Sequence, residues 1–573
     1  MTIDHGEYQE LVDSLRRKLL KTARKTMHGD KIKTIELAFQ VANQAHLGQF
    51  RKSGEPYITH PIEVATFIAE WDLDEQTIAG ALMHDVIEDT PVTKKELARI
   101  FGNNIAELVD SVTKLDKLHF ESEAAAHAEY FRKVVLAMAK DVRVILIKLA
   151  DRMHNMLTLG SMRADKQKRI ARETMEIYVP IANRIGLHKV HLELAEESFK
   201  YLYPMRYKIL KHAAEKALID RQPTIQAILT NIEAAMRANG IHAEFKYRQR
   251  TISNIYNRML KRNDTFNNIY NIFEVKVIVD KIGDCYLALG VLHSIYQPIP
   301  SRFKDYIAIP KTNGYQSLHS TTMGPNGTPI QLHIRTKEME EIAEQGVISH
   351  WIKENHSSNY NKASKQTSNW LSNILDIQSS TATATDFLDN ILKDLSPNNI
   401  YVFTPKGRIL HLPKGSTPVD FAYAIHTNVG CFCSKARINQ RLSSLDTKLQ
   451  NGDIIEIITN NSSEPDKEWL NFAVTGKAIS KIKQYFKSDE EISCGISLFN
   501  YGLAMTGHSD LVNNRLDEFI SKNYPRSNHD EFLQRIGSGD LSVLNVVEQY
   551  TGKQIEIHLS KCIIPIIQDI KCY

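Results

Sequence analysis

One short stretch of the sequence concentrates side chains that bind metal ions. The segment HDVIEDT places the imidazole of His84 beside the carboxylate of Asp85, and two more carboxylates follow at Glu88 and Asp89. On a continuous helix, His84 would share one face with Glu88, and Asp85 would share one with Asp89. The apolar segment IAGALM precedes them, so these groups should lie at the wall of a core, where polar side chains need a partner. A metal ion would be such a partner.

Two other segments contain further candidate ligands. THP contains His60 upstream, and KLADRMHNM contains Asp151, His154 and Asn155 downstream. A lone His-Asp pair is better explained as a solvated acidic helix end, but these two segments favour a metal site instead. The predicted ligands are two imidazoles and two carboxylates: His60, His84, Asp85 and Asp151. Such a set would leave positions open for water and substrate, and its ligand types suit several metals, zinc and iron among them.

The order H…HD…D resembles the HD phosphohydrolase superfamily, and longer motifs narrow the resemblance. RKSGEPYITHP (51–61), HDVIEDT and IKLADRMHNMLTL (147–159) resemble the hydrolase domain of RelA/SpoT homologues, which make and destroy guanosine tetra- and pentaphosphate, (p)ppGpp. The resemblance runs to about residue 560. It implies Mn²⁺ at the ligand set, removal of the 3′-pyrophosphate from (p)ppGpp to give GDP or GTP, and control of the stringent response.

The same resemblance implies roles for residues around the metal. Glu88 and Asp89 are not needed as ligands and would activate or orient the attacking water, whose pKa a metal ion lowers. The basic turn RKSGEP, alone a typical solvated turn, matches the family's nucleotide-binding turn. The implied substrate contacts are Arg51, Lys52, Ser53, Asn155 and Thr158. Leu157 stands where many relatives carry Arg, a change expected to weaken a phosphate contact.

The elements that must position these groups are helices. From residue 5 to about 200, apolar residues recur at helical spacing and turn residues separate the runs, which predicts an all-α, HD-type bundle for residues 1–200. Residues 201–353 change to an α+β pattern with a predicted helix at DCYLALGVLHSIY. The predicted strands include NIFEVKVIVD (271–280), DYIAIP (305–310) and PIQLHIRT (329–336).

The α+β segment resembles the nucleotidyltransferase-like synthetase domain of the same family, which transfers pyrophosphate from ATP to the 3′-hydroxyl of GDP or GTP. RFKDYIAIPKTNGYQSLHS (302–320) matches the family's guanine-binding loop. The residues that the resemblance places at a nucleotide are Arg248, Arg250, Lys304, Asn313, Tyr315 and His319. A guanine nucleotide is therefore an expected ligand of this domain.

The catalytic acids of that domain are replaced in this chain. Comparison with the family pattern puts Asn271 at the position of the magnesium-binding Asp and Gln331 at that of the catalytic Glu. Amides supply neither the charge that holds Mg²⁺ nor the basicity that activates a hydroxyl, so synthetase activity is predicted to be lost. Lys276 and His333 are further departures. Glu274 is an alternative acid, but its odd spacing from Asn271 predicts opposite strand faces.

The remaining segments carry no predicted chemistry. Residues 354–396 are rich in Ser, Thr and Asn and predict a linker with one short helix. Residues 397–461 resemble a β-grasp TGS domain with a helix capped by Thr417. Residues 462–573 predict a helical domain that ends in a degenerate start of the next family module. The TGS resemblance implies docking of a regulatory protein and, at His426, contact with tRNA or the ribosome.

Composition limits the class of protein. The chain is 42% hydrophobic and 24% charged, and its net charge of +4 gives no chain-wide basic footprint for nucleic acid. It has no apolar run of about 18 residues and no signal-peptide pattern, so no membrane contact is expected. Its six cysteines form no CxxC pair, which is typical of reduced thiols and predicts a cytoplasmic protein.

The predicted function is a metal-dependent (p)ppGpp 3′-pyrophosphohydrolase whose synthetase domain is retained for regulation. Two alternatives stay open: a bifunctional synthetase and hydrolase, and a non-catalytic sensor that binds guanine nucleotides and docks partners through the TGS domain. The complete set of metal ligands and the Glu-Asp pair count against the sensor, because a pure binder does not need them.

Overall fold

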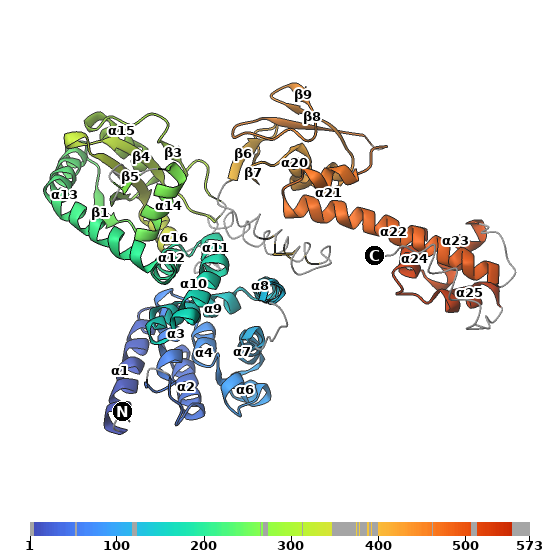
Figure 1. Cartoon of the computed structure of the whole chain (residues 1–573), viewed down its shortest axis with the longest axis horizontal. Coiled ribbons are helices and arrows are strands. Elements are labelled where there is room, and N and C mark those ends of the chain that lie inside the picture. The colour runs from blue at the N-terminus through green and yellow to red at the C-terminus, as the bar shows by residue number, and fades with distance from the viewer. Residues whose placement is uncertain are drawn as a thin grey trace. The chain divides into compact units, whose positions relative to one another are not determined.

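The computed structural model describes most of the chain, which divides into two compact units (Figure 1). Unit 1 comprises residues 1–378 and 382–396, and unit 2 comprises residues 379–381 and 397–573. The described residues are 5–51, 54–116, 123–263, 265–266, 273–311, 313–345, 374, 378, 387–388, 391, 399–460, 462–505, 513–525 and 527–552. Lys52, Ser53 and Asn271 therefore lie outside the described residues.

The first part of unit 1 is an all-helical bundle, which confirms the predicted fold class. Its helices are α1 (His5–Ala23), α2 (Asp30–Ala45), α3 (Thr59–Glu70), α4 (Glu75–Leu82), α5 (Val86–Asp89), α6 (Lys94–Phe101), α7 (Asn103–Asp116), α8 (Glu123–Lys140), α9 (Val142–Leu157), α10 (Ala164–Glu173), α11 (Val179–Arg184) and α12 (His188–Leu202). Short helical turns lie at Leu159–Ser161 and Thr174–Tyr178.

Helix α9 runs through the centre of this bundle. Every residue from Val144 to Ala150 is buried, because α3, α4, α7, α8 and α12 all pack against α9. Its first turn begins at Asp141, whose carboxylate accepts a hydrogen bond from the Arg143 amide at 2.9 Å. The last turns of α9, which carry the predicted Asp151 and Asn155, are thus held by a helix that is packed on several sides.

The four-residue spacings in HDVIEDT predicted one continuous helix, but the helix is interrupted within this segment. Helix α4 ends at Leu82, α5 begins at Val86, and His84 and Asp85 lie in the turn between them. The backbone carbonyl of His84 accepts a hydrogen bond from Thr113 Oγ1 at 3.3 Å. The turn places the side chains of His84 and Asp85 next to residues of α3 and α9.

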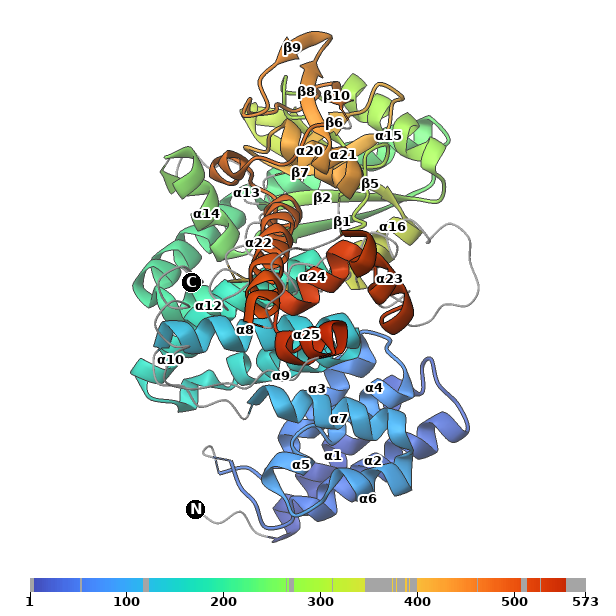
Figure 2. The same cartoon turned by 90° about the vertical axis from the view of Figure 1, so that its right-hand side faces the viewer.

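The second part of unit 1 is an α+β domain with a five-stranded sheet of order β1-β2-β5-β4-β3. Its strands are β1 (Ala243–Gln249), β2 (Phe273–Val279), β3 (Lys304–Asp305), β4 (Leu318–Met323) and β5 (Pro329–Thr336). Its helices are α13 (Pro204–Ala238), α14 (Ile252–Arg262), α15 (Ile282–Ile295), α16 (Lys337–Gln345) and the turn η4 (Pro325–Gly327). Figures 1 and 2 show this sheet and the helical bundle at opposite ends of unit 1.

The two faces of the sheet differ in chemistry. Strands β2 and β5 run parallel with Glu274 opposite Gln331, and the other pairs are antiparallel. Phe273, Val275 and Leu332 belong to the core that α13 and α15 cover. Since side chains alternate along a strand, the residues between them face the other way, towards a polar cavity.

The predicted strand at 305–310 is only two residues long in the structure. The carboxylate Oδ1 of Asp305 accepts hydrogen bonds from the amides of Ile307, at 2.9 Å, and Ala308, at 2.8 Å. These bonds close a turn and take the two amides away from any strand pairing. The predicted strand therefore ends at Asp305.

Part of the predicted linker packs into the bundle. Ile374, Phe387 and Ile391 are fully buried and belong to the same hydrophobic core as α3 and α9. These described positions of the 354–396 segment thus contribute apolar surface to unit 1. Trp370, which marked the predicted short helix, lies outside the described residues.

Unit 2 combines a small β-grasp domain with helices. It contains β6 (Asn399–Phe403), β7 (Ile409–Pro413), α20 (Pro418–Ile425), α21 (Thr427–Cys431), β8 (Cys433–Ile438), β9 (Arg441–Ser443), β10 (Ile455–Thr459), η5 (Lys467–Asn471), α22 (Gly476–Met505), α23 (Asn513–Asn523), α24 (His529–Gly537) and α25 (Val543–Thr551). The predicted cap of α20 is present, since Thr417 and Asp420 form a reciprocal capping box. The buried Asp420 also accepts from the amides of Val474 and Thr475, which ties α20 to the start of α22.

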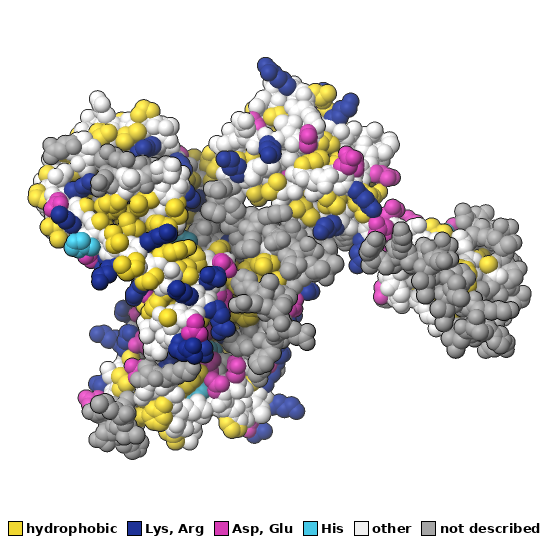
Figure 3. Space-filling model, in the orientation of Figure 1, with side chains coloured by type: hydrophobic (Ala, Val, Ile, Leu, Met, Phe, Trp, Pro, Cys, Tyr) yellow, Lys and Arg dark blue, Asp and Glu magenta, His cyan; other side chains and the backbone are white. Residues whose placement is uncertain are grey.

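The surface carries both signs of charge. Figure 3 shows Lys and Arg side chains interspersed with Asp and Glu, and hydrophobic side chains gathered over α13 and α14. Exposed hydrophobic residues of these two helices include Met205, Ile209 and Leu260. Among the described residues, no helix combines the length and apolar character needed to cross a membrane.

Candidate functional site

The four predicted metal ligands converge at the centre of the bundle. His60 comes from the first turn of α3, His84 and Asp85 from the turn before α5, and Asp151 from α9. His60 Nε2 lies 3.2 Å from Asp151 Oδ1 and 3.9 Å from Asp85 Oδ2, and His84 Nε2 lies 3.1 Å from Asp85 Oδ1. Ligand atoms of His60, His84 and Asp151 all lie within 4.8 Å of one another.

The donor atoms at this site fit a divalent cation. His84 Nδ1 lies 2.8 Å from the Ala81 carbonyl, which can only accept, so Nδ1 carries a proton and Nε2 is the nitrogen that can bind a metal ion. His84 Nε2 is buried and faces Asp85 Oδ1 at 3.1 Å. An imidazole buried among carboxylates needs a positive charge between them, and a metal ion at this position would supply it.

Charges around the site favour ionised carboxylates. Burial would raise the pKa of Asp151, but the charge of Lys148 and the adjoining His60 hold it well below its ordinary value. Burial would lower the pKa of His84, but Asp85 and Asp151 raise it to about 9 when no metal is bound. A metal ion would compete with that proton, because a ligating imidazole must be unprotonated.

Lys148 is a residue that the sequence reasoning missed. Its side chain is 3% exposed, and Nζ lies 3.4 Å from Asp151 Oδ2, one turn further along α9. The three-residue spacing between Lys148 and Asp151 was the available signal. The buried ammonium orients the carboxylate and supplies positive charge to the site.

Tyr57 is a second missed residue, and it connects a predicted ligand with the predicted water-activating pair. Its hydroxyl lies 2.8 Å from Asp85 Oδ2 and 2.8 Å from Asp89 Oδ2, so it shares one proton between two carboxylates. The ring stacks on His46 at a centroid distance of 4.7 Å. Glu88 is partly buried and Asp89 is exposed. The sequence signal was weak, because Tyr57 precedes α3 and its partners are far along the chain.

Two of the predicted substrate contacts adjoin the metal ligands. Arg51 Nη2 donates to Asn155 Oδ1 at 3.3 Å, and Asn155 Nδ2 donates to Asp151 Oδ1 at 2.7 Å. Thr158 lies at the end of α9, where its hydroxyl donates to the backbone carbonyl of His154 at 3.0 Å. Leu157 is 53% exposed. Lys52 and Ser53 fall outside the described residues.

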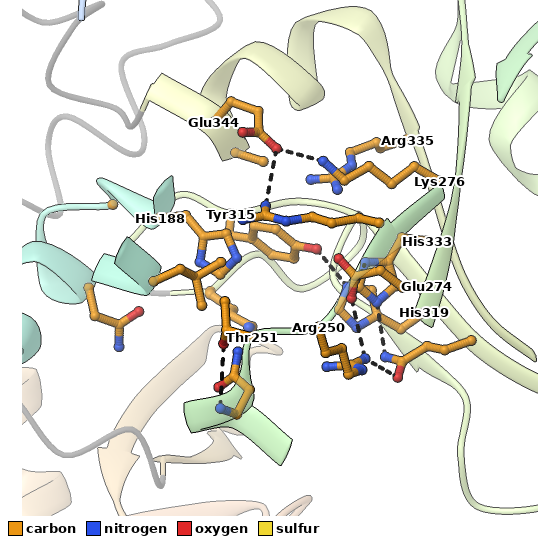
Figure 4. A pocket seen from close by; sticks show the side chains of 18 of the residues that line it. His188, Arg250, Thr251, Glu274, Lys276, Tyr315, His319, His333, Arg335 and Glu344 are labelled. Atoms are coloured by element: carbon orange, nitrogen blue, oxygen red, sulfur yellow. Dashed lines mark hydrogen bonds and ion pairs between the residues drawn. The ribbon is translucent and has the colours of Figure 1, made fainter. Parts of the chain in front are cut away.

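A second candidate site is a cavity of about 240 Å³ on the polar face of the sheet (Figure 4). Six cationic side chains line it: Arg248, Arg250, Arg258, Lys276, Lys311 and Arg335. Asn183 and His188, from α11 and α12 of the bundle, form part of its wall. The excess of positive charge in an enclosed space suits a phosphorylated ligand.

Several of these cations are already paired with acids inside the cavity, as the dashed lines of Figure 4 indicate. Lys276 Nζ lies 2.6 Å from Glu344 and 2.9 Å from Glu340. Arg250 Nη2 lies 3.3 Å from Glu274 and also donates to Gln331 Oε1. The residues that depart from the family pattern, Glu274, Lys276 and Gln331, therefore interact with the site rather than point away from it.

Glu274, the alternative acid, lines this cavity, and its position relative to Asn271 stays a prediction. Alternation from Asn271 placed Glu274 on the opposite face, but β2 begins only at Phe273 and Asn271 lies outside the described residues. Glu274 lines the same cavity as Gln331, its partner on β5. Strand parity therefore does not remove Glu274 from the synthetase-like site.

The predicted nucleotide-binding loop lies at this cavity. Tyr315 OH is 2.7 Å from His319 Nε2, and the His319 ring stacks on His333 at a centroid distance of 3.9 Å. Asn313 Nδ2 donates to the Asn183 carbonyl of the bundle at 3.0 Å. Lys304 lies on β3, where it is exposed.

In the TGS-like domain, His426 caps a short helix. Its Nδ1 accepts from the Asn428 amide at 3.2 Å, at the start of α21.

Comparison with known proteins agrees with the order of the domains. Residues 38–188 match the HD domain, residues 225–377 match a region found in RelA / SpoT proteins, and residues 400–459 match the TGS domain. The chain is 46% identical over 517 residues to the bifunctional (p)ppGpp synthase/hydrolase SpoT of Escherichia coli K12, covering 89% of this chain and 73% of that protein.

Two further relatives carry different names. The guanosine-3′,5′-bis(diphosphate) 3′-pyrophosphohydrolase of Vibrio cholerae is 42% identical over 551 residues, covering 96% of this chain and 77% of that protein. A GTP pyrophosphokinase of Streptomyces coelicolor is 42% identical over 485 residues, covering 81% of this chain and 57% of that protein. With the HD, RelA/SpoT and TGS regions in this order and such identity over most of its length, the chain belongs to the RelA/SpoT family, among its long, SpoT-like members.

Proposed function

We propose that this protein is a guanosine-3′,5′-bis(diphosphate) 3′-pyrophosphohydrolase that removes the 3′-pyrophosphate of (p)ppGpp and so controls the stringent response. The observation that carries the proposal is the convergence of His60, His84, Asp85 and Asp151, whose nitrogen and oxygen atoms face one another in a buried position. Relatives at 42–46% identity bear the name of this enzyme. Mn²⁺ is the proposed cofactor.

The residues of the chain divide the work as follows. His60, His84, Asp85 and Asp151 would hold the ion, which when bound supplies a polarised phosphoryl oxygen and a more acidic water. Glu88 and Asp89 accept or orient the proton of the attacking water, and Tyr57 fixes Asp89 relative to Asp85. Arg51 and Asn155 lie beside Asp151 and bind the substrate, together with Lys52, Ser53 and Thr158.

Substitution of the ligands tests this function. His84→Ala or Asp85→Ala should abolish both Mn²⁺ binding and the release of pyrophosphate from ppGpp, measured by calorimetry and by chromatographic separation of the nucleotides. His28→Ala, at an exposed histidine away from the site, is the matched control and should behave like the wild type. Full turnover by protein stripped with EDTA would contradict the proposal.

We further propose that synthetase activity is lost. The support comes from charge: Gln331 has no carboxylate, and the basic groups beside it are engaged by Glu274, Glu340 and Glu344. The alternative is a bifunctional enzyme. It is favoured by the carboxylate of Glu274 in the cavity and by the bifunctional name of the E. coli relative.

These two candidates are separated in a His84→Ala background, where hydrolysis cannot hide weak synthesis. ATP and GDP with Mg²⁺ should give no detectable (p)ppGpp in that variant. Asn271→Asp with Gln331→Glu should recover more synthesis than either repair alone, because the two acids act as one catalytic unit. Product formed by the unrepaired chain would establish the bifunctional alternative.

The cavity of the synthetase-like domain is proposed to bind a guanine nucleotide for regulation. Tyr315 offers an aromatic face, and the basic lining suits phosphates. GDP should release measurable heat with wild-type protein and less with Tyr315→Ala. Absence of heat for both proteins would leave the domain with a structural role and would also remove the sensor alternative.

The TGS domain is proposed to dock a regulatory protein, or tRNA and the ribosome through His426. We place the protein in the cytoplasm. The described cysteines Cys285, Cys431 and Cys433 are free thiols, which is typical of a reducing compartment.

A further inference from the structure

We propose that His154 is a positioning residue that fixes the tautomer of His60 for the metal ion and couples that ligand to Arg51. The proposal rests on the proposed hydrolase function for its biological meaning. His154 lies on α9 between Asp151 and Asn155 in a buried position, and nothing in the ligand set requires a third imidazole there.

The hydrogen-bond geometry determines where the protons lie. His154 Nδ1 is 2.9 Å from His60 Nδ1 and 3.1 Å from Arg51 Nη1. A guanidinium only donates, so His154 Nδ1 must be the acceptor and carries no proton. The proton between the two Nδ1 atoms therefore belongs to His60.

This proton position prepares His60 for a metal. With the proton on Nδ1, the lone pair of His60 lies on Nε2, which faces Asp151 Oδ1 at 3.2 Å. Two hydrogen-bond acceptors that face each other at that distance repel when no cation lies between them. The pair therefore attracts a cation. His154 thus does for His60 what the Ala81 carbonyl does for His84. Each sets the protonated nitrogen on the far side of the ring.

The same contacts form a closed ring of five side chains. Asn155 donates a hydrogen bond to Asp151, and Arg51 donates one to Asn155 and one to His154. His60 donates to His154 and also faces Asp151, which closes the ring. Two of the five guanidinium N–H groups of Arg51 are directed into this ring, and the others remain for a substrate. Arg51, a proposed phosphate contact, is therefore held in place by two groups that adjoin metal ligands.

A matched pair of substitutions tests the inference without substrate. In His154→Asn, the amide oxygen can occupy the position of Nδ1 and accept the same hydrogen bonds; in His154→Leu, a methyl group occupies that position. Loss of an outer hydrogen bond to a ligating histidine typically lowers metal affinity about 10–100-fold. Calorimetry with Mn²⁺ should show that loss for His154→Leu and a near wild-type dissociation constant for His154→Asn.

Nitrogen NMR of the histidines in metal-free wild-type protein gives a second, independent readout. His60 should carry its proton on Nδ1 and His154 on Nε2, and His154→Asn should preserve the His60 tautomer. A wild-type His60 protonated on Nε2 would overturn the proposal, even if His154→Leu failed to fold. So would equal Mn²⁺ affinity of the two variants. Failure of wild-type protein to cleave ppGpp would instead reject the hydrolase function and leave the metal-site inference standing.

Discussion

At the residue scale, Glu88 and Asp89 stand in different surroundings although they are adjacent. Glu88 is partly buried beside the ligands, whereas Asp89 is exposed and receives the Tyr57 hydroxyl. Glu88→Gln should keep Mn²⁺ and substrate bound while turnover falls about 10²–10⁴-fold, as expected for a group in general acid–base catalysis. An equally large loss of Mn²⁺ affinity would mean that Glu88 is a ligand.

Tyr57→Phe removes one oxygen and keeps the ring that stacks on His46. Without the shared proton, Asp85 and Asp89 lose the contact that holds them together. We expect a lower kcat for ppGpp hydrolysis with little change in KM and with thermal stability close to wild type. An unchanged kcat would show that the hydroxyl does not contribute to the reaction.

The sequence predicted the proposed metal ligands better than the residues that hydrogen-bond to them. His60, His84 and Asp151 were predictable because residue type alone suggests metal binding and three motifs repeated the suggestion. Tyr57 was not, because a tyrosine has many uses and its partner Asp85 is 28 residues away in the chain. The hydrogen bond between Tyr57 and Asp85 forms only when the start of α3 packs against the turn between α4 and α5. A rule based on local residue spacing cannot predict such a contact.

At the element scale, helices α22 and α24 of unit 2 approach so closely that their backbones touch at two glycines. A Cβ atom on Gly495 would lie 1.9 Å from the Leu533 carbonyl oxygen, and one on Gly537 would lie 1.8 Å from that of Glu491. Gly495→Ala should therefore destabilise unit 2 by about 1–3 kcal/mol or separate the helices, because the obstacle is backbone.

Gly290→Ala on α15 is the matched control for that substitution. Nothing lies within 4 Å of its added Cβ, so the alanine should be neutral or stabilise the helix by up to about 1 kcal/mol. Denaturant titration followed by circular dichroism measures both variants. Equal stability of Gly495→Ala and wild type would show that the two helices are not in contact in solution.

Helices were predicted from periodicity far more reliably than their interruptions. The break between α4 and α5 includes a hydrogen bond from Thr113, which is 29 residues from His84. The early end of the 305–310 strand depends instead on a local competitor, the Asp305 carboxylate. The hydrogen bond from Thr113 is a tertiary contact that the local sequence does not show. Asp305 is visible in the local sequence, but the alternation of apolar residues after it was the stronger signal and predicted a longer strand.

At the scale of the whole molecule, unit 1 carries buried histidines that remain neutral when it is folded. Burial, with nearby cations such as Arg335, holds the pKa of His319 and His333 well below the ordinary value, and burial beside His191 lowers that of His188 to about 3. In the unfolded chain these groups take up protons below about pH 6.5. The stability they contribute is therefore present above pH 6.5 and lost as the pH falls.

His333→Gln tests this linkage at one position. The loss of unfolding free energy between pH 7 and pH 5 should be smaller than in wild type by about 2 kcal/mol, since one group no longer takes up a proton on unfolding. Urea titrations of the full chain at the two pH values measure the difference. Parallel pH dependences of variant and wild type would indicate that His333 is already protonated in the folded protein.

Domain order was predictable along the chain because each domain has its own pattern, but the boundary of unit 1 was not. The segment 354–396 was predicted to be a linker from its polar composition, yet Ile374, Phe387 and Ile391 are buried in the bundle core. A few apolar residues in a polar segment are enough to anchor it, since each fully buried one contributes about 1.5–3 kcal/mol.

The pairing of Glu274 with Gln331 across β2 and β5 also bears on how this lineage can evolve. Restoring Glu at position 331 alone would set two carboxylates opposite each other on neighbouring strands. The two would share the guanidinium of Arg250, and Arg258, whose Nη2 donates to Gln331 Oε1 at 3.4 Å, would be a second cation beside position 331. The acid at 274 is thus epistatic to position 331, because the benefit of regaining a carboxylate at 331 depends on which residue stands at 274. In the laboratory, adding Glu274→Ala to the two repairs is expected to give more synthesis than the two repairs alone, and natural reversal is expected to be easier where position 274 changes first.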